Sequence, residues 1–230
     1  MTSSRWHAHG NVYLVSEDDD LTPETVREHA RGSDGIVQVV RAVDEQLEVV
    51  IWNTDGSTAE MSGNGTRIAG AWLMQRSGAT EVRVVIGPRS VGVRKLDDGL
   101  YESEMGAVRV GDPEIVDGIE LTTVDVGNPH AVVLGDPDDV TRLGQLLEKH
   151  PRFPGRTNVQ VARVDAPGEV TARVWERGVG ETTASGSSAV AVAAATHGDG
   201  DVLVRFPGGD LHVRLRDGRA WLTGPAEPSP

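Results

Sequence analysis

Two serines in this chain stand directly before glycine-rich segments where helices are expected to begin. Ser62 precedes Gly63-Asn64-Gly65, and Ser185 precedes Gly186-Ser187-Ser188. The first backbone N–H groups of a helix have no acceptor within the helix, and the helix dipole places partial positive charge there. A carboxylate or another anion binds well at such a point. The sequence therefore predicts two anion-binding helix starts, each with a hydroxyl beside it.

A hydroxyl at such a position has limited chemistry of its own. The helix dipole contributes about 0.3 to 2 kcal/mol, which lowers a pKa by only about one unit. A serine hydroxyl is far too weakly acidic for this shift to make it a base at neutral pH. Taken alone, Ser62 and Ser185 are therefore expected to be ordinary helix N-caps.

The two serine segments belong to an internal repeat. Four pairs of similar segments occur in the same order in the two halves of the chain. These pairs are Trp52 and Trp175, Ser62 and Ser185, residues 37–41 and 159–163, and Gly10-Asn11 and Gly127-Asn128. The first two pairs are 123 residues apart, the third 122 and the fourth 117. Ordered echoes of this kind predict two homologous lobes.

Hydrophobic patterns indicate which helices lie at the centres of the lobes. Residues 68, 69 and 71–74 are apolar on nearly all sides of an expected helix over 63–77, and residues 187–197 are almost wholly Ala and Val in an expected helix over 186–197. Both patterns predict helices that are buried on every side. A third, amphipathic helix is expected to follow Asp136. Its apolar stripe would consist of Val140, Leu143, Leu146 and Leu147.

Strands are expected to fill most of the remaining chain. The first should cover residues 12–15, and the last two should be joined by a hairpin turn at Asp217-Gly218, because Asp-Gly favours tight hairpins. The proline-rich end, residues 225–230, is expected to be frayed.

The composition limits the partners of the chain. Its 230 residues carry a formal net charge of −13, with an isoelectric point near 4.9. This charge argues against nucleic acid or an anionic membrane surface as a partner, because both need a basic face. No apolar run approaches a membrane span, and residues 1–7 lead into no apolar signal-peptide core. We therefore expect a globular protein in the cytoplasm.

Several cofactors and mechanisms find no support in the sequence. Cysteine is absent, which removes disulfides and every thiolate base or ligand. The two lysines, Lys95 and Lys149, are expected in a turn and at a helix end, so a Schiff base to pyridoxal phosphate is not expected. The seven histidines show no metal-ligand spacing such as HExxH. We expect no cofactor and no metal site.

Longer motifs carry a resemblance to a known family. They are residues 53–67 (NTDGSTAEMSGNGTR), 126–132 (VGNPHAV), 156–159 (RTNV), 175–182 (WERGVGET), 206–209 (FPGG) and 222–225 (LTGP). In this order, and over nearly the whole chain, they closely resemble the diaminopimelate epimerases.

The resemblance implies both a fold and a reaction. The fold would be α/β (α+β), with two lobes related by a pseudo-twofold axis, each a curled and mostly antiparallel sheet around a central helix. The lobes would be residues 1–106 with a returning strand at 218–230, and residues 107–217. Members of this family interconvert LL- and meso-diaminopimelate, in lysine and peptidoglycan-precursor biosynthesis. They use no cofactor and invert the α-carbon with two thiols on opposite faces of a substrate held between the lobes. A homodimer is also implied.

The resemblance further implies which residues form the site. The thiol positions match Ser62 and Ser185, and these are the catalytic candidates together with Glu176 and His130. Glu176 would bind the distal ammonium and tune the site, as His130 would on the other side, and Arg177 would clamp the distal carboxylate. The remaining substrate-binding candidates are Asn11, Asn53, Gly63, Asn64, Asn128, Asn158, Gly186 and Ser187.

Each candidate also has an ordinary structural interpretation. An asparagine beside glycine is most often a turn residue. A single arginine after a strand usually forms a solvated ion pair, and a single histidine in a strand usually has a structural role. The asparagines favour a binding function only as a group.

The two serines leave several functions open. They could mark a natural branch of the family or a change from cysteine made to trap a ligand. The branch is favoured by further departures, namely Val12 for an acidic residue, Ser187-Ser188 for Thr-Gly and a shorter chain than usual. The alternatives are a protein that binds an amino acid without epimerising it, or a related isomerase or dehydratase with Glu176 or His130 as its base. Phosphate or nucleotide binding fits the glycines but lacks the Walker lysine.

Overall fold

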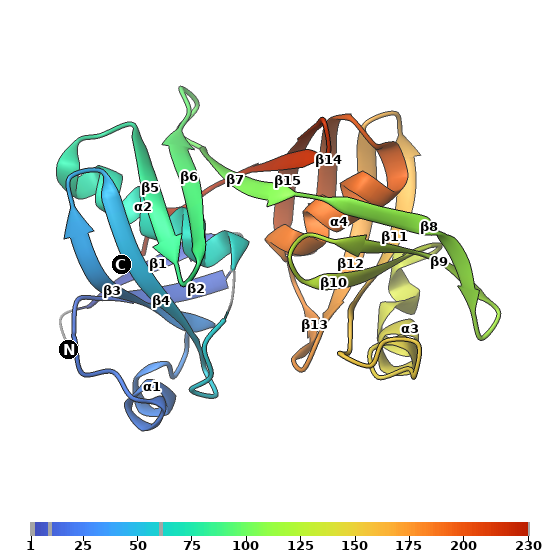
Figure 1. Cartoon of the computed structure of the whole chain (residues 1–230), viewed down its shortest axis with the longest axis horizontal. Coiled ribbons are helices and arrows are strands. Elements are labelled where there is room, and N and C mark those ends of the chain that lie inside the picture. The colour runs from blue at the N-terminus through green and yellow to red at the C-terminus, as the bar shows by residue number, and fades with distance from the viewer. Residues whose placement is uncertain (1–2, 9–10, 60–61, 230) are drawn as a thin grey trace. The chain divides into compact units, whose positions relative to one another are not determined.

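The computed structural model describes residues 3–8, 11–59 and 62–229 (Figure 1). Gly10 of the fourth echo and Glu60-Met61 of the first serine motif lie outside the described residues. The chain forms two compact units. One is Met1–Glu104 with Thr223–Pro230, and the other is Met105–Leu222.

The first unit is a mixed sheet with two helices. Its strands are β1 (Ser3–Ala8), β2 (Asn11–Ser16), β3 (Gly35–Val43), β4 (Gln46–Asn53), β5 (Glu81–Ile86), β6 (Arg89–Lys95), β7 (Tyr101–Ala107) and β17 (Glu227–Pro228). Its helices are α1 (Pro23–His29) and α2 (Gly63–Ser77). The β2–β3 and β4–β5 pairs are parallel, and each is connected through a helix. The pairs β1–β2, β3–β4, β5–β6 and β6–β7 are antiparallel.

The second unit repeats this order of elements. Its strands are β8 (Arg109–Val116), β9 (Ile119–Asp125), β10 (Pro129–Leu134), β11 (Asn158–Ala166), β12 (Glu169–Glu176), β13 (Gly180–Thr182), β14 (Gly200–Phe206), β15 (Gly209–Arg216) and β16 (Arg219–Gly224). Its helices are the 3₁₀ turn η1 (Pro137–Asp139), α3 (Val140–Leu147) and α4 (Gly186–His197). The parallel pairs β10–β11 and β12–β14 are again connected through helices, whereas β9–β10, β11–β12 and β14–β15 are antiparallel. The repeat predicted from the sequence is therefore present in the fold.

The two central helices are buried as predicted. Helix α2 contacts strands β1 to β6 of its own unit, and α4 contacts β9 to β12, β14 and β15 of the other (Figure 1). Every residue from 63 to 74 is buried. Helix α2 ends at Gly78, whose φ of 78° is the left-handed conformation that glycine adopts without steric cost. No helix in the described part of the chain is long and apolar enough to cross a bilayer.

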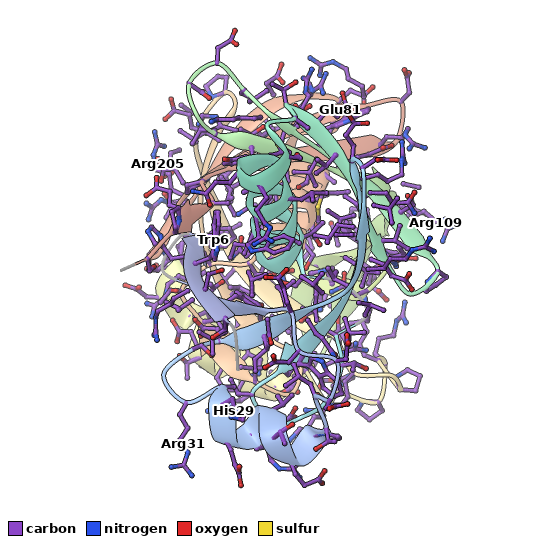
Figure 2. The ribbon with its side chains drawn as sticks, turned by 90° about the vertical axis from the view of Figure 1, so that its left-hand side faces the viewer. Trp6, His29, Arg31, Glu81, Arg109 and Arg205 are labelled. Atoms are coloured by element: carbon purple, nitrogen blue, oxygen red, sulfur yellow. The ribbon has the colours of Figure 1, made fainter. Side chains whose placement is uncertain are left out.

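The core of the first unit is closed by aromatic side chains of the first two strands. Trp6 of β1, labelled in Figure 2, is 2% exposed and packs in one cluster with Tyr13 of β2 and with Ile68 and Trp72 of α2. Trp6 and Tyr13 are directly opposite each other in the β1–β2 pair. Tyr13 therefore sits in an apolar layer between the sheet and the central helix.

One of the four sequence echoes is out of register. Ile36 is the cross-strand partner of Trp52, and Val159 is the partner of Trp175, so β3 and β11 correspond at an offset of 123 rather than 122. A slip of one residue turns every side chain to the other face of a strand. Gln38 and Gln160 accordingly lie on opposite faces of their strands. The similarity of residues 37–41 to 159–163 therefore gave an offset for these strands that is wrong by one residue.

Three further expectations need correction, and one is confirmed. Leu146 was expected in the apolar stripe of α3 but is 44% exposed. Its side chain leaves the helix in a different direction from those of Val140, Leu143 and Leu147, which form the buried stripe. The strands β1 and β8 were missed: both are rich in polar or exposed residues, and β8 contains Pro113 beside a register shift. The proline-rich end is not frayed over its whole length, since β17 pairs with β1. The hairpin turn at Asp217-Gly218 is confirmed, with φ of 51° and 67°.

Candidate active site

Ser62 caps helix α2. Its backbone is extended, with φ of −138° and ψ of 117°, and its Oγ accepts a hydrogen bond from the N–H of Gly65 at 3.1 Å. The carbonyl of Ser62 accepts the hydroxyl of Thr66 at 2.6 Å. On its other side, Ser62 Oγ lies 3.1 Å from the hydroxyl of Tyr13. Ser62 is therefore both the cap that the residue type suggested and one member of a pair of hydroxyls.

A polar cluster fills the first turns of the same helix. Asn64 is buried, and its Nδ2 donates to Asn11 Oδ1 at 2.5 Å. The guanidinium of Arg67 donates to Asn64 Oδ1 and, at 3.3 Å, to the carbonyl of Gly63. Arg67 is fully buried, and this burial lowers its pKa to about 10, so the side chain stays charged at neutral pH. The start of α2 thus carries a buried cation in addition to the helix dipole.

Asn53 lies apart from this cluster. It is exposed, its Nδ2 donates to Ser57 Oγ at 2.9 Å, and its carbonyl accepts the N–H of Gly56 at 3.0 Å. Asp55 completes the turn by accepting the N–H of Ser57 at 2.8 Å. In this structure Asn53 uses its amide inside the turn, which is the ordinary role of an asparagine beside glycine.

Ser185 occupies the corresponding position before helix α4. Its φ of −147° and ψ of 128° are close to those of Ser62, and it is 8% exposed. Its carbonyl accepts the N–H of Ala189 at 3.0 Å, but its hydroxyl makes no capping hydrogen bond. The hydroxyl of Ser185 is therefore not committed to its own helix.

A buried chain of polar groups leads from β10 to α4. His130 is 1% exposed, and its Nε2 lies 3.0 Å from Asn128 Oδ1. Gln160 Nε2 lies 3.0 Å from His130 Nδ1 and donates to Ser188 Oγ at 3.0 Å. An amide nitrogen can only donate, so Nδ1 is the acceptor and Nε2 carries the imidazole proton. Asn128 Nδ2 in turn donates to Ser187 Oγ at 3.5 Å.

Burial keeps His130 neutral. The absence of water around the ring lowers the pKa of His130 to about 4, because a buried imidazolium is poorly solvated. The nitrogen that could accept a proton already faces Gln160. In this arrangement His130 positions Asn128 and the start of α4, and neither ring nitrogen is free to act as a base.

The turn that carries Glu176 and Arg177 is held by buried side chains from elsewhere in the unit. Asn158 Oδ1 accepts the backbone N–H of Arg177 at 2.9 Å, while Asn158 Nδ2 donates to the carbonyl of Pro129 at 2.9 Å. The carboxylate of Glu176 accepts the hydroxyl of Thr182 at 2.6 Å. The side chain of Arg177 is exposed and donates to the carbonyl of Gly155 at 3.3 Å. Asn158 thus orients the turn, and the head group of Arg177 remains at the surface.

Glu148, which the sequence analysis did not single out, secures the next residue of this turn. Its Oε1 accepts the N–H of Gly178 at 2.8 Å and pairs with Arg156, and its Oε2 accepts the indole N–H of Trp175 at 2.9 Å. Burial alone would raise the pKa of Glu148, but the hydrogen bonds from Trp175, Gly178 and Arg156 together lower it. A buried, ionised carboxylate therefore fixes both ends of the segment that contains Glu176 and Arg177.

The structure brings the candidates together in two groups, one in each unit. The first contains Ser62, Gly63, Asn64 and Asn11, with Tyr13 and Arg67 added. The second contains His130, Asn128, Ser187, Gly186 and Ser185, with Gln160 added, and beside it lies the turn of Glu176 and Arg177. Within the described ranges, histidines and acidic residues form no group of three or more that could hold a metal ion. For Gln160, the sequence offered one signal, namely a polar residue inside an otherwise apolar strand.

Comparison with known proteins shows the family of the chain. A family model described as diaminopimelate epimerase matches residues 7–111 and 122–227, which is most of the chain. The chain belongs to the diaminopimelate epimerase family.

Curated relatives support the same assignment. A diaminopimelate epimerase from Corynebacterium glutamicum is 35% identical, over 97% of this chain and 94% of that protein. One from Methanothermobacter thermautotrophicus is 34% identical, with the same two coverages of 97% and 94%. This family membership makes the chain an isomerase.

Solved structures with the same fold are more distant in sequence. A predicted epimerase from Pseudomonas aeruginosa has a TM-score of 0.78 and 17% identity, over 99% of this chain and 96% of that chain. A hydroxyproline epimerase from Agrobacterium vitis, solved with bound trans-4-hydroxy-L-proline, has a TM-score of 0.68 and 16% identity, over 99% and 88%. At these identities the likeness concerns the fold.

Proposed function

We propose that this protein interconverts LL- and meso-diaminopimelate by moving a proton at the α-carbon, without a cofactor. The observation that supports the proposal most directly is the duplication of the site. Each unit places a serine before a buried central helix, and each joins the second residue of that helix to an asparagine at the start of a strand (Asn11 of β2) or directly before one (Asn128 before β10). The joined pairs are Asn64 with Asn11 and Ser187 with Asn128.

The two helix starts suit the reacting end of such a substrate. Backbone N–H groups around Gly63-Asn64 and Gly186-Ser187 would receive the α-carboxylate. Positive charge at these points also stabilises the negative charge that develops when the α-proton leaves. Ser62 and Ser185 would then stand on the two faces of the α-carbon, one to accept a proton and the other to deliver one.

The distal end of the substrate would bind at the turn held by Asn158 and Glu148. Arg177 has an exposed guanidinium on a fixed backbone, which suits bidentate binding of a carboxylate. Glu176 lies next to it with a carboxylate that suits an ammonium group. A carboxylate and a guanidinium on adjacent residues of one turn suit the ammonium and carboxylate groups at the second amino acid end of a diamino diacid.

Calorimetric titration with diaminopimelate tests the binding site. Arg177→Ala should weaken binding by about 1.5 to 3 kcal/mol, because a charge-assisted pair is lost. Arg163→Ala is the matched control, since Arg163 is an exposed arginine of the same unit that pairs with Asp165 at 2.9 Å. Equal affinity of the Arg177→Ala variant and the parent would remove the distal carboxylate role. No measurable binding by the parent would refute the proposed substrate.

Thiol replacement tests the chemistry. A thiol has an unperturbed pKa near 8.5, which a helix start lowers into a useful range, so Ser62→Cys with Ser185→Cys should raise epimerisation by orders of magnitude. Either single substitution should restore much less inversion, because each face of the α-carbon needs its own proton carrier. A double variant that binds the diacid but stays inactive would favour a binding protein instead.

The proposal also includes the setting of the enzyme. Following the family resemblance, we place it in the cytoplasm, in lysine and peptidoglycan-precursor biosynthesis, as a homodimer. Sedimentation at micromolar concentration tests the last point, and a monomer would contradict it.

A further inference from the structure

Tyr13 and His130 occupy equivalent positions in the two units. Tyr13 comes two residues after Asn11, and His130 comes two residues after Asn128. In the parallel strand pairs, Tyr13 is opposite Gly35 and His130 is opposite Asn158. Gly35 and Asn158 are 123 residues apart, which is the offset of the two tryptophans and the two serines. The tyrosine therefore stands where the second unit has its buried histidine.

Tyr13 touches the hydroxyl of the first serine directly. Its phenol oxygen lies 3.1 Å from Ser62 Oγ, which also accepts the N–H of Gly65. Either hydroxyl can donate in this pair, and a Tyr13 phenolate, which has no proton, would accept the proton of Ser62 Oγ. The geometry forms a path for a proton from the start of α2 to the phenol.

A phenol is the more suitable base of the two. Its unperturbed pKa of about 10 lies far below that of an aliphatic hydroxyl, so a phenolate forms far more readily than an alkoxide on Ser62. The start of α2, which holds Ser62, favours negative charge through the helix dipole, and it also carries the buried guanidinium of Arg67, which donates to Asn64 Oδ1.

Apolar side chains pack around the ring of Tyr13. In the described part of the first unit, the side chains that share its face of the sheet are apolar, such as Trp6 of β1, Val37 of β3 and Ile51 of β4. Arg5 and His7 alternate with Trp6 along β1 and so point to the opposite face. Charged groups belong to the neighbouring segments: Asp34 Oδ2 accepts the N–H of Val12 at 2.7 Å, and the guanidinium of Arg67 donates to Asn64 Oδ1.

We propose that Tyr13 is the proton-accepting partner of Ser62, a role that rests on the proposed function. The Tyr13 phenolate takes the proton of the Ser62 hydroxyl while Ser62 Oγ takes the α-proton of the substrate. The electron pair of the broken C–H bond stays on the substrate as a carbanion, and Tyr13 ends as a neutral phenol. Reversal of these two transfers returns a proton, or a deuteron from solvent, to the same face.

Exchange of the α-proton of diaminopimelate in deuterated water, followed by NMR, tests this role. The rate for the parent should rise about tenfold per pH unit between pH 7 and 9, because the phenolate fraction rises about tenfold per unit at every pH well below the pKa of the phenol. Tyr13→Phe should lower the rate at pH 9 at least a hundredfold and remove this slope. Tyr101→Phe is the matched control, since Tyr101 is the second of the two tyrosines, and it should change neither.

Two results of this experiment would overturn the inference. One is a Tyr13→Phe protein with the rate and slope of the parent. The other is a parent that binds the diacid but shows no exchange at any pH. In a Ser62→Cys background the thiol replaces the pair, so adding Tyr13→Phe should then change the rate less than threefold. A large further loss would indicate a purely structural tyrosine and would also count against the role.

A second measurement needs no substrate and separates this inference from the proposed function. In Tyr101→Phe protein, ultraviolet absorbance reports the ionisation of Tyr13 alone. Adding Ser62→Ala removes the hydroxyl that stabilises the phenolate, so the titration midpoint should move up by about one unit or more. An unchanged midpoint would refute the Tyr13–Ser62 pair even where diaminopimelate binds. If the parent does not bind diaminopimelate but Ser62→Ala shifts the titration midpoint of Tyr13, only the proposed substrate is refuted and the Tyr13–Ser62 pair stands.

Discussion

Replacing Glu148 should destabilise the second unit more than its position at the end of a helix suggests. The residue is 5% exposed, and its two oxygens accept hydrogen bonds from Gly178, Trp175 and Arg156. Glutamine in this place keeps one carbonyl oxygen and puts an NH₂ group where the second acceptor was. One of the N–H donors then faces another donor, and Arg156 loses its counterion.

The size of the effect follows from these contacts. Removing one partner of a buried ion pair costs about 3 to 5 kcal/mol when the other charge stays buried. The side chain of Arg156 is 41% exposed, so water solvates part of the charge left behind and the cost falls to the lower end of this range or below it. We expect Glu148→Gln to lower the free energy of unfolding by about 2 to 3 kcal/mol at pH 7, and Glu148→Ala by at least as much.

Urea unfolding followed by circular dichroism measures this change. Glu120→Gln is the control, because Glu120 is an exposed glutamate of β9, and it should stay within about 0.5 kcal/mol of the parent. A loss below 0.5 kcal/mol for Glu148→Gln would show that the carboxylate does not hold the turn in solution. The same variant should also weaken binding of diaminopimelate, because Glu176 and Arg177 lie between the residues that Glu148 fixes.

The pH dependence gives an independent check. The folded-state pKa of Glu148 is lowered below its ordinary value of 4.5, so the folded protein binds this proton less readily than the unfolded chain. The stabilisation is therefore present above about pH 4.5 and is lost as the pH falls through the folded-state pKa. The gap between the parent and Glu148→Gln should shrink under acid conditions. A gap that stays constant down to pH 3 would contradict the argument.

Two further predictions concern the same unit. Burial holds the pKa of His130 near 4, below the ordinary 6.5, so the unfolded chain binds more protons than the folded protein between these two pH values. The free energy of unfolding should therefore rise with pH across this window, on the order of 3 kcal/mol in total. His130→Gln should flatten that part of the profile of urea midpoint against pH, and an unchanged slope would argue against a neutral buried ring. Gly144→Ala should destabilise by about 1 to 3 kcal/mol in urea unfolding despite the better helix propensity of alanine, because its Cβ would lie 2.3 Å from Cγ of Trp175. Gly155→Ala, whose Cβ would meet nothing within 4 Å, should be nearly neutral, and equal effects of the two glycine variants would refute the packing argument.

The sequence determined the buried helices and the serines in front of them. Runs of apolar and small residues around 63–77 and 186–197 allow only a helix that is packed on all sides, and glycines mark the ends. The recurrence of tryptophan and serine at one offset predicted the repeat, since both residues occupy fixed points of the same supersecondary unit. These features are local or periodic, and local physics is sufficient to specify them.

The register of the strands and the partners of the polar side chains required the tertiary structure. Gln38 and Gln160 occur in nearly identical segments, yet Gln38 accepts the indole N–H of Trp52, whereas Gln160 binds Ser188. The face that each glutamine takes depends on which residue of the neighbouring strand lies opposite, and that choice is made by the packing of whole sheets. Tyr13 and Glu148 reach Ser62 and Gly178 across 49 and 30 residues, and no local pattern in the chain encodes contacts of that separation.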